Sequence, residues 1–375
     1  MLLPEVGYGW GEIRAGLDRV MVILICALFA LGVVSIYSAG KEVRSSTVVY
    51  VARQLVWGGV SAAVYVAILR VGYRNFVRLS FWMYAGTVLC LIVLGVRGIV
   101  SGVTVARWFQ FGGVSFQPAE LGKVTLILFM SRFCSRRPPE NVKNFFAALA
   151  ICGVSVLLIL IQPDLGSALV YVAIIFAILT VAGTPMKYMA WLSGVALCAM
   201  PVLWKGMREY QRLRLIVFLD PYIDPQGAGY NVIQSRIAVG SGGLWGKGFL
   251  QGTQGRLHFL PAPHTDFIFS VFAEEFGFIG GIIVIVLFAC LFWRILRGAF
   301  RTKDTGAKLL CVGVVAWLWF QVMESIAMSM GLAPITGIPM PLFSYGGSSL
   351  LMVAIALALA QSVAISPVKE KFAHI

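Results

Sequence analysis

The sequence predicts an all-α polytopic membrane protein with about ten transmembrane helices and one large extracytoplasmic loop. Charged residues make up only 12% of the 375 residues and hydrophobic ones 59%, whereas a soluble domain carries about 25% charged residues. The apolar residues also fall in long runs separated by short polar segments. Because these runs are continuous and do not alternate with polar residues, they exclude the strands of a membrane β-barrel.

One transmembrane helix needs about 20 mostly apolar residues. On this basis the predicted spans are 20–40, 50–70, 77–97, 118–134, 144–162, 165–184, 187–204, 266–293, 308–332 and 342–365. The span 118–134 has the weakest hydropathy because it contains Glu120 and Lys123. The opening residues are too polar and acidic for a signal peptide, so we expect the first run to stay as a helix. We expect a single integral membrane domain over residues 1–375.

The longest polar stretch, residues 205–265, separates the seventh and eighth spans. Within it, residues 207–221 place Tyr210, Leu213 and Ile216 on one helical face and Arg208 and Arg212 on another. This pattern predicts an amphipathic helix that lies on the bilayer. Residues 229–240 predict a second short helix. The glycines that follow between 240 and 248 would let the backbone approach another group closely.

The distribution of Lys and Arg predicts the orientation. One set of short loops and span ends is rich in them, as in Arg132, Arg136 and Arg137, while the opposite set holds only Lys41, Arg44, Arg53, Arg97 and Arg107. The richer side is cytoplasmic by the positive-inside rule. We therefore expect both termini in the cytoplasm of a multi-pass inner (cytoplasmic) membrane protein, with the long loop outside.

The net charge of +14 does not indicate a nucleic-acid partner, because most basic residues flank apolar runs. No P-loop, GxSxG or HExxH motif occurs, so nucleotide hydrolysis and standard hydrolase chemistry have no support. The seven cysteines lie in or beside apolar runs without a CxxC spacing. We interpret them as packing residues.

Asp266 lies where the polar loop meets the next apolar run. A charge is costly at that depth, so an ionisable group there is a candidate functional residue. We interpret it as the base of a membrane-embedded enzyme, although Thr265 and Asp266 could equally cap the helix. His264 with one Asp makes no recognisable metal site. We expect Glu274 or Glu275, two turns further, to bond to loop backbone or to an Arg.

Three other ionisable residues near the spans have a structural interpretation beside the catalytic one. Glu120 and Lys123 are three residues apart, so they can form an ion pair on one helix. Asp164 follows Pro163 in the segment QPDLGS and precedes an apolar run. We therefore expect it to cap the next helix.

Four segments resemble the signature blocks of the SEDS family (shape, elongation, division and sporulation). These segments are RWFQFGGVSFQPAELGK (107–123), QPDLGSALV (162–170), residues 224–277 and GIPMPLFSYGGSS (337–349). Their order and spacing cover nearly the whole chain, and GSGGLWGKGFLQGTQ and AEE look like the elongation branch more than the division branch. The chain departs from the family pattern at MESIAMSMGLAP, where Ser325 and Ala333 replace the usual residues and Glu324 is an unusual neighbour.

The resemblance implies a ten-helix fold and a peptidoglycan glycosyltransferase that polymerises lipid II. It places the family's catalytic aspartate on Asp266. From the resemblance and from position near the outer face, the candidate substrate-binding residues are Arg107, Glu120, Lys123, Asp164, Arg236, Lys247, His264 and Ser344. The implied partners are lipid II and the growing lipid-linked glycan, a class B penicillin-binding protein (a transpeptidase), the elongation machinery and membrane lipids.

Lipid II polymerisation needs a base for the attacking hydroxyl and positive charge for the departing diphosphate. Asp266 is the expected base. The candidate cations are Arg107, Lys123, Arg236 and Lys247, or a divalent ion such as Mg²⁺ bridging the phosphates. No other cofactor is indicated.

Two other functions stay open: a lipid II flippase or other carrier of lipid-linked substrates, and a scaffold that only recruits a transpeptidase. A carrier should hold its ionisable groups near the midplane, whereas Asp266 and the Gly-rich loop lie at the outer edge. An assay of the isolated protein would identify a scaffold.

Overall fold

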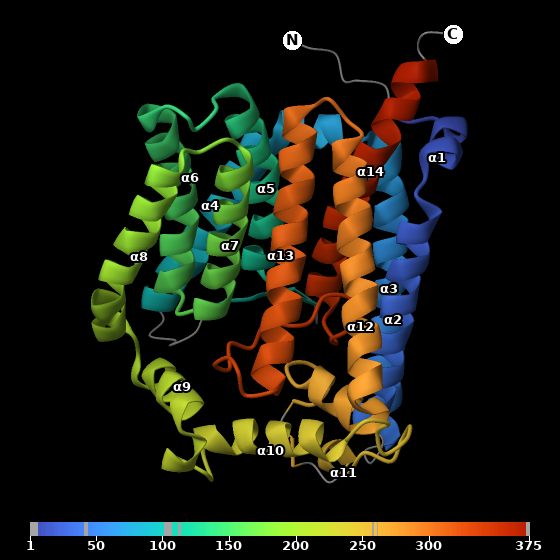
Figure 1. The fold of residues 1–375 in the computed structure, drawn as a ribbon, viewed down its shortest axis with the longest axis vertical. Helices are drawn as coiled ribbons and strands as arrows, with labels where there is room; N and C mark the ends of the chain where they lie inside the picture. Colours follow the sequence, from blue (N-terminus) through green and yellow to red (C-terminus); the bar gives the residue numbers. More distant parts are fainter. Residues whose placement is uncertain are drawn as a thin grey trace.

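The computed structural model describes residues 7–40, 44–100, 107–111, 114–256, 259–260 and 262–372. Within these ranges, long helices stand side by side and shorter ones lie across one end (Figure 1). The upright helices are α2 (Arg19–Ala39), α3 (Arg44–Val71), α4 (Tyr73–Val100), α5 (Pro118–Arg136), α6 (Val142–Ile161), α7 (Leu165–Val181), α8 (Met186–Gly206), α12 (Ile268–Phe300), α13 (Thr305–Ser329) and α14 (Gly347–Phe372). Eight are long and apolar enough to cross a membrane, and α5 and α7 complete the bundle. The predicted polytopic helical fold is confirmed.

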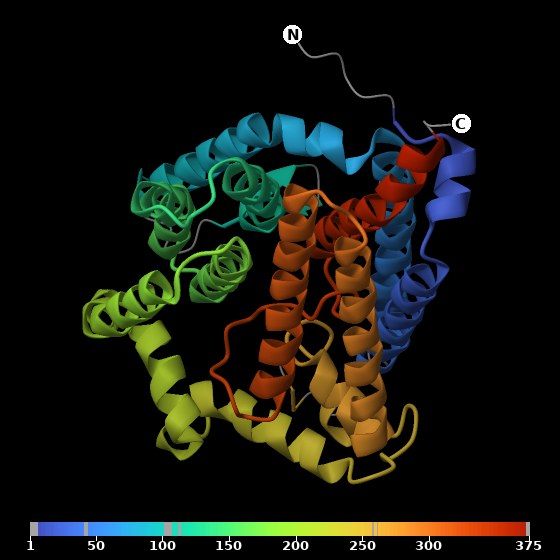
Figure 2. The same ribbon diagram turned by 45° about the horizontal axis from the view of Figure 1, so that its top comes forward.

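The upright helices differ in how deeply they are packed. In α14, 78% of the apolar window is buried, and in α13 67%, whereas in α8 the share is only 6%. Helices α13 and α14 therefore form the centre of the bundle. Helix α8 stands at its outer edge, as Figures 1 and 2 both show.

Helices of the long polar segment lie across the lower end of the bundle (Figures 1 and 2). They are α9 (Glu209–Leu219), the 3-10 turn η1 (Pro221–Ile223), α10 (Ala228–Ser241) and α11 (Thr253–Arg256). Both predicted short helices of this segment are confirmed. Ser235 in α10 contacts the Ser270 hydroxyl at 2.7 Å and donates to the Ser329 carbonyl at 2.7 Å. These bonds tie α10 to α12 and α13.

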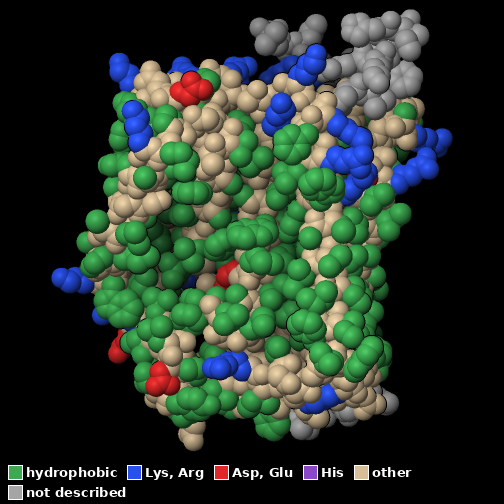
Figure 3. All heavy atoms as spheres, viewed as in Figure 1, with side chains coloured by type: hydrophobic (Ala, Val, Ile, Leu, Met, Phe, Trp, Pro, Cys, Tyr) green, Lys and Arg blue, Asp and Glu red, His purple; other side chains and the backbone are tan. Residues whose placement is uncertain are grey.

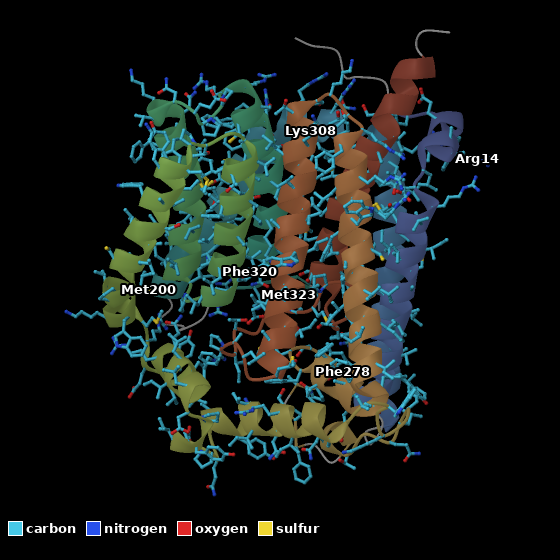
Figure 4. All side chains as sticks on the ribbon, viewed as in Figure 1. Arg14, Met200, Phe278, Lys308, Phe320 and Met323 are labelled. Carbon is cyan, nitrogen blue, oxygen red and sulfur yellow. The ribbon has the colours of Figure 1, made fainter. Side chains whose placement is uncertain are left out.

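The opposite end of the bundle is basic. Helix α1 (Trp10–Gly16) and the C-terminal end of α14 lie there, and Lys and Arg side chains gather along it (Figure 3). Arg14 and Lys308 mark this end, while Phe278 lies near the other (Figure 4). The two ends therefore differ in charge as the sequence predicts.

Two of the predicted spans that differ from the structure flank the candidate site. The span expected at 266–293 begins at Ile268 and runs to Phe300, so Asp266 lies in a turn before the helix. The span expected at 342–365 begins at Gly347, because residues 341–343 form a turn in which Leu342 has φ +63°, outside the helical region.

Helix α12 contains a break that receives the Gly-rich loop. Gly277 has φ +65° and ψ −165°, values outside the helical region. Beside it, the N–H groups of Lys247 and Gly248 donate to the carbonyls of Glu274 and Glu275, each at 3.0 Å. The loop backbone thus replaces helical partners and is fixed against α12.

We expect Gly246→Ala to loosen this junction. An added Cβ at Gly246 would lie 2.1 Å from the Glu275 carbonyl oxygen, so the backbone must shift. At Gly243, also at positive φ, no described atom lies within 4 Å of such a Cβ. Gly243→Ala should therefore cost only about 1–2 kcal/mol of backbone strain. In thermal unfolding of the detergent-purified protein, equal melting temperatures for the two variants would contradict this assignment.

Candidate active site

Asp266 lies half-buried in the turn before α12, at the end of the bundle opposite the basic end. Burial raises the pKa of its carboxyl, while a hydrogen bond from Thr265 and the positive charge of Arg214 lower that pKa. Because burial is the largest of these effects, the pKa of Asp266 lies above its ordinary value. The backbone passes close by at Gly337, where an added Cβ would lie 3.5 Å from Asp266 Oδ2.

His264 and Ser344 hold the turn that carries Asp266. The His264 ring stacks on Tyr50 with 4.5 Å between centroids, and its carbonyl accepts from the N–H of Tyr345 at 2.9 Å. Ser344 Oγ donates to the Thr265 carbonyl at 2.8 Å. Burial lowers the pKa of His264, which favours the neutral ring. The contacts that the structure gives His264 and Ser344 therefore position the turn that carries Asp266.

Asp164 and Arg107 form a second polar group at the start of α7. As expected, Asp164 caps this helix, accepting from the N–H and hydroxyl of Ser167 at 3.2 and 3.0 Å. Arg107 lies 3.8 Å from the Asp164 carboxylate and also donates to the Pro163 carbonyl. Gln117, which precedes α5, donates to Asp164 at 3.2 Å. One carboxylate therefore links three segments.

Arg214 of α9 joins these two regions, and the sequence interpretation missed it. It lines a cavity together with Arg107, Asp164 and Thr336, donates to the Ile335 carbonyl at 3.1 Å, and acts electrostatically on Asp266. The signal was present: Arg214 follows Tyr210 by four residues, so this cation lies on the otherwise apolar face of α9.

The cavity beside Arg214 is small. It encloses about 30 Å³, room for about two water molecules. Figure 3 shows a hollow between α7, α9 and α13 in which acidic and basic side chains are visible. Phe320 and Met323 of α13 lie at about the height of this hollow (Figure 4). The cavity itself is therefore too small for a sugar ring.

Glu120 and Lys123 form the predicted ion pair in the first turns of α5. Lys123 Nζ donates to Glu120 Oε1 at 2.5 Å and lies 5.3 Å from the centroid of the Trp317 ring. Both side chains are buried, and Glu120 Oε2 has no hydrogen-bond partner among the described residues. The pair lies one turn beyond the Gln117–Asp164 contact, so it adjoins the second polar group.

Glu324 is a further acidic residue whose contacts could not be predicted from the sequence. It is buried in α13 and accepts a hydrogen bond from the Thr336 hydroxyl. It is near enough to Asp266 for the two charges to interact.

Within the described ranges no three His, Cys, Asp or Glu side chains cluster to hold a metal ion. Mg²⁺ held mainly by substrate phosphates needs only one or two carboxylates, and Glu324 Oε2, which has no hydrogen-bond partner among the described residues, would be a candidate ligand.

Lys247 and Arg236 lie apart from this arrangement. Lys247 Nζ donates to the buried Glu274 at 2.6 Å, and Glu274 also accepts from the N–H of Thr253 at 2.8 Å. The expected bond from Glu274 to loop backbone is confirmed, with Lys247 in place of an Arg. Arg236 is exposed on α10 and packs against Gly331. The charge of Lys247 is therefore already balanced.

Residues 18–367 match the model of the FtsW/RodA/SpoVE family, described as cell cycle protein. The chain belongs to this family. The SEDS resemblance carried by the four sequence blocks is confirmed.

Three similar proteins illustrate the match. Peptidoglycan glycosyltransferase MrdB of Escherichia coli (strain K12) is 34% identical over 357 residues, which cover 94% of each chain. A second similar protein is a chain in a solved structure of a peptidoglycan synthase complex, described as showing the structural coordination of polymerization and crosslinking. It has 33% identity and a TM-score of 0.78, and the match covers 93% of this chain and 97% of that one. The crystal structure of the rod shape determining protein RodA of Thermus thermophilus has 28% identity and a TM-score of 0.69, covering 93% and 96%.

We expect Lys123→Met to destabilise the fold because it leaves the buried Glu120 carboxylate without its cation. Breaking one side of a buried pair costs about 3–5 kcal/mol, whereas replacing both partners is far milder. The double variant Glu120→Gln/Lys123→Met should therefore regain most of the melting temperature lost by Lys123→Met. A double variant no more stable than the single one would show that the pair is not structural.

Proposed function

We propose that this chain is a peptidoglycan glycosyltransferase that polymerises lipid II into glycan strands during cell-wall elongation. The observation that carries the proposal is the half-buried Asp266 at the end of the bundle, under the charge of Arg214. The names of the E. coli relative and of the synthase complex support the same activity. Asp266 is the general base.

The reaction joins a sugar hydroxyl to the anomeric carbon of a lipid-linked donor. Asp266 accepts the hydroxyl proton as the oxygen forms the new bond and the bond from the anomeric carbon to the diphosphate oxygen breaks. Diphosphate is a good leaving group, so no second carboxylic acid is required, unlike in glycosidases. An α-linked donor then gives a β-linked product by inversion.

Arg107 and Arg214 are the cations best placed for the departing diphosphate. Both guanidiniums are held by backbone carbonyls, at Pro163 and Ile335, and both line the same cavity. Arginine presents several N–H donors in a planar fork that suits phosphate oxygens. A divalent ion such as Mg²⁺, when bound, would add positive charge to the phosphates.

The distribution of charge supports an enzyme over a carrier. Asp266 precedes α12, Asp164 caps α7, and Glu120 lies in the first turn of α5. All three belong to helix starts at the end opposite the basic one. A lipid II flippase would be expected to hold such groups near the midplane.

We further propose that the basic end faces the cytoplasm of the inner membrane and that α9 and α10 lie outside. A class B penicillin-binding protein is the proposed partner, with the elongation machinery and membrane lipids around it. The exposed apolar side chains Phe278, Ile283, Val286 and Trp293 of α12 suit the single helix of such a transpeptidase.

Asp266→Asn should abolish polymerisation of purified lipid II while the protein stays folded, because an amide is no base at neutral pH. Loss of a positioned base lowers the rate by about 10²–10⁴-fold. Asp220→Asn is the matched control, because Asp220 is exposed in the same loop and caps η1, a role that Asn also fills. Near wild-type turnover by Asp266→Asn would remove Asp266 from the mechanism.

The acid side of the pH–rate profile should report Asp266. Asp266 must be ionised to act as the base, and its pKa is raised. As the pH decreases, activity should therefore begin to fall at a pH above the ordinary aspartate pKa of about 4. Arg214→Gln removes a charge that lowers this pKa, so its acid limb should move to higher pH. Arg212→Gln is the control, because Arg212 lies on the same helix but bonds to the Trp204 carbonyl at 2.9 Å and is not among the charges that act on Asp266. Equal shifts in both variants would contradict the assignment.

A further inference from the structure

A second cavity, far from Asp266, lies between α4 and α5 at the basic end. It encloses about 340 Å³, within the size range of small-molecule sites. Its charged lining residues are Arg78, Arg132, Arg136 and Arg137, and no carboxylate of a described residue lines it. Four like charges around one space repel each other, so a bound anion would stabilise the arrangement.

One of these arginines is fixed by the fold. Arg132 donates from one nitrogen to the carbonyls of Arg78 at 2.5 Å and Val77 at 3.4 Å. A guanidinium has five N–H donors, so these bonds leave donors for a ligand. Arg136 and Arg137 follow on the same helix end and are exposed. The cavity therefore combines one anchored cation with two accessible ones.

The remaining wall is aromatic and turned toward lipid. Phe81 lies edge-to-face with Trp82 and with Phe129, at 5.2 and 5.8 Å between centroids. Phe129 stacks on Tyr84 at 5.2 Å, and Tyr84 donates to the Ile151 carbonyl of α6. Trp82 is 72% exposed and Phe81 49%. In a membrane protein, such side chains near a span end contact acyl chains and headgroups.

We propose that this cavity binds an anionic phospholipid of the leaflet at the basic end, with its phosphate among the arginines and an acyl chain along the aromatic wall. Basic pockets between transmembrane helices suit phosphate-bearing headgroups. A headgroup with two phosphates can engage more of these guanidiniums than a headgroup with one. An acidic protein segment would match the charge but would leave the aromatic wall uncovered. This site is independent of the proposed transferase activity.

The test is native mass spectrometry of the detergent-purified full chain titrated with tetraoleoyl cardiolipin, dioleoyl phosphatidylglycerol and dioleoyl phosphatidylcholine. Cardiolipin should bind most tightly and phosphatidylcholine least. Each cation contributes about 1 kcal/mol to such binding, so Arg136→Gln/Arg137→Gln should weaken cardiolipin binding about thirtyfold. Arg301→Gln/Lys303→Gln removes the same charge from exposed positions at the same end and should leave binding unchanged.

Several results would overturn the proposal. Equal losses of cardiolipin affinity in the two double variants would mean general attraction to a basic surface. Phosphatidylcholine binding as tight as that of cardiolipin would mean that the cavity does not select lipids by charge. Displacement of cardiolipin by polyglutamate but not by phosphatidylglycerol would assign the cavity to an acidic protein. As a second measurement, acyl-brominated phosphatidylglycerol should quench less tryptophan fluorescence in Trp82→Phe than in the parent protein. Undiminished quenching would also contradict the site.

Discussion

A charge in the apolar part of a membrane protein must be neutralised by other protein groups, and this constraint organises the structure. Ion pairs among the described residues include Glu120–Lys123, Arg107–Asp164, Lys247–Glu274 and Asp18–Arg294. The described interactions of Asp266 are weaker: the Thr265 hydroxyl and the charge of Arg214, against a larger effect of burial. A carboxylate with so little compensation can gain or lose a proton, which is what a general base requires.

Irregular backbone makes this position possible. The turn of residues 263–267 and the non-helical segment 338–346 contact each other through Ser344 and Tyr345. Non-helical backbone at membrane depth is tolerated where protein covers it or where it lines a cavity. Here the turn of residues 263–267 keeps Asp266 outside helix α12. The aromatic contact between His264 and Tyr50 fixes the same turn from α3.

The bundle was predictable from the sequence, because long apolar runs need only their own length to be recognised. Asp266, Asp164 and the Glu120–Lys123 pair were predictable because each lies at a change of pattern or at helical spacing. The spacing of Arg214 from Tyr210 placed this cation on the apolar face of α9, but its role was missed because its contact with Ile335 joins residues 121 positions apart. His264 and Ser344 were expected to bind substrate, but their contacts to Tyr50 and to backbone depend on tertiary packing that no local pattern encodes.

The most direct measurement of the central claim is chemical rescue of lipid II polymerisation by purified Asp266→Ala. Replacing the Asp side chain by the methyl group of Ala removes the carboxylate and leaves space beside the attacking hydroxyl, which a small carboxylate can enter. The account predicts an inactive variant that regains turnover with added formate but not with formamide at the same concentration. Turnover close to that of the parent protein without any additive would contradict it, because the proton would then leave by a route that does not involve Asp266.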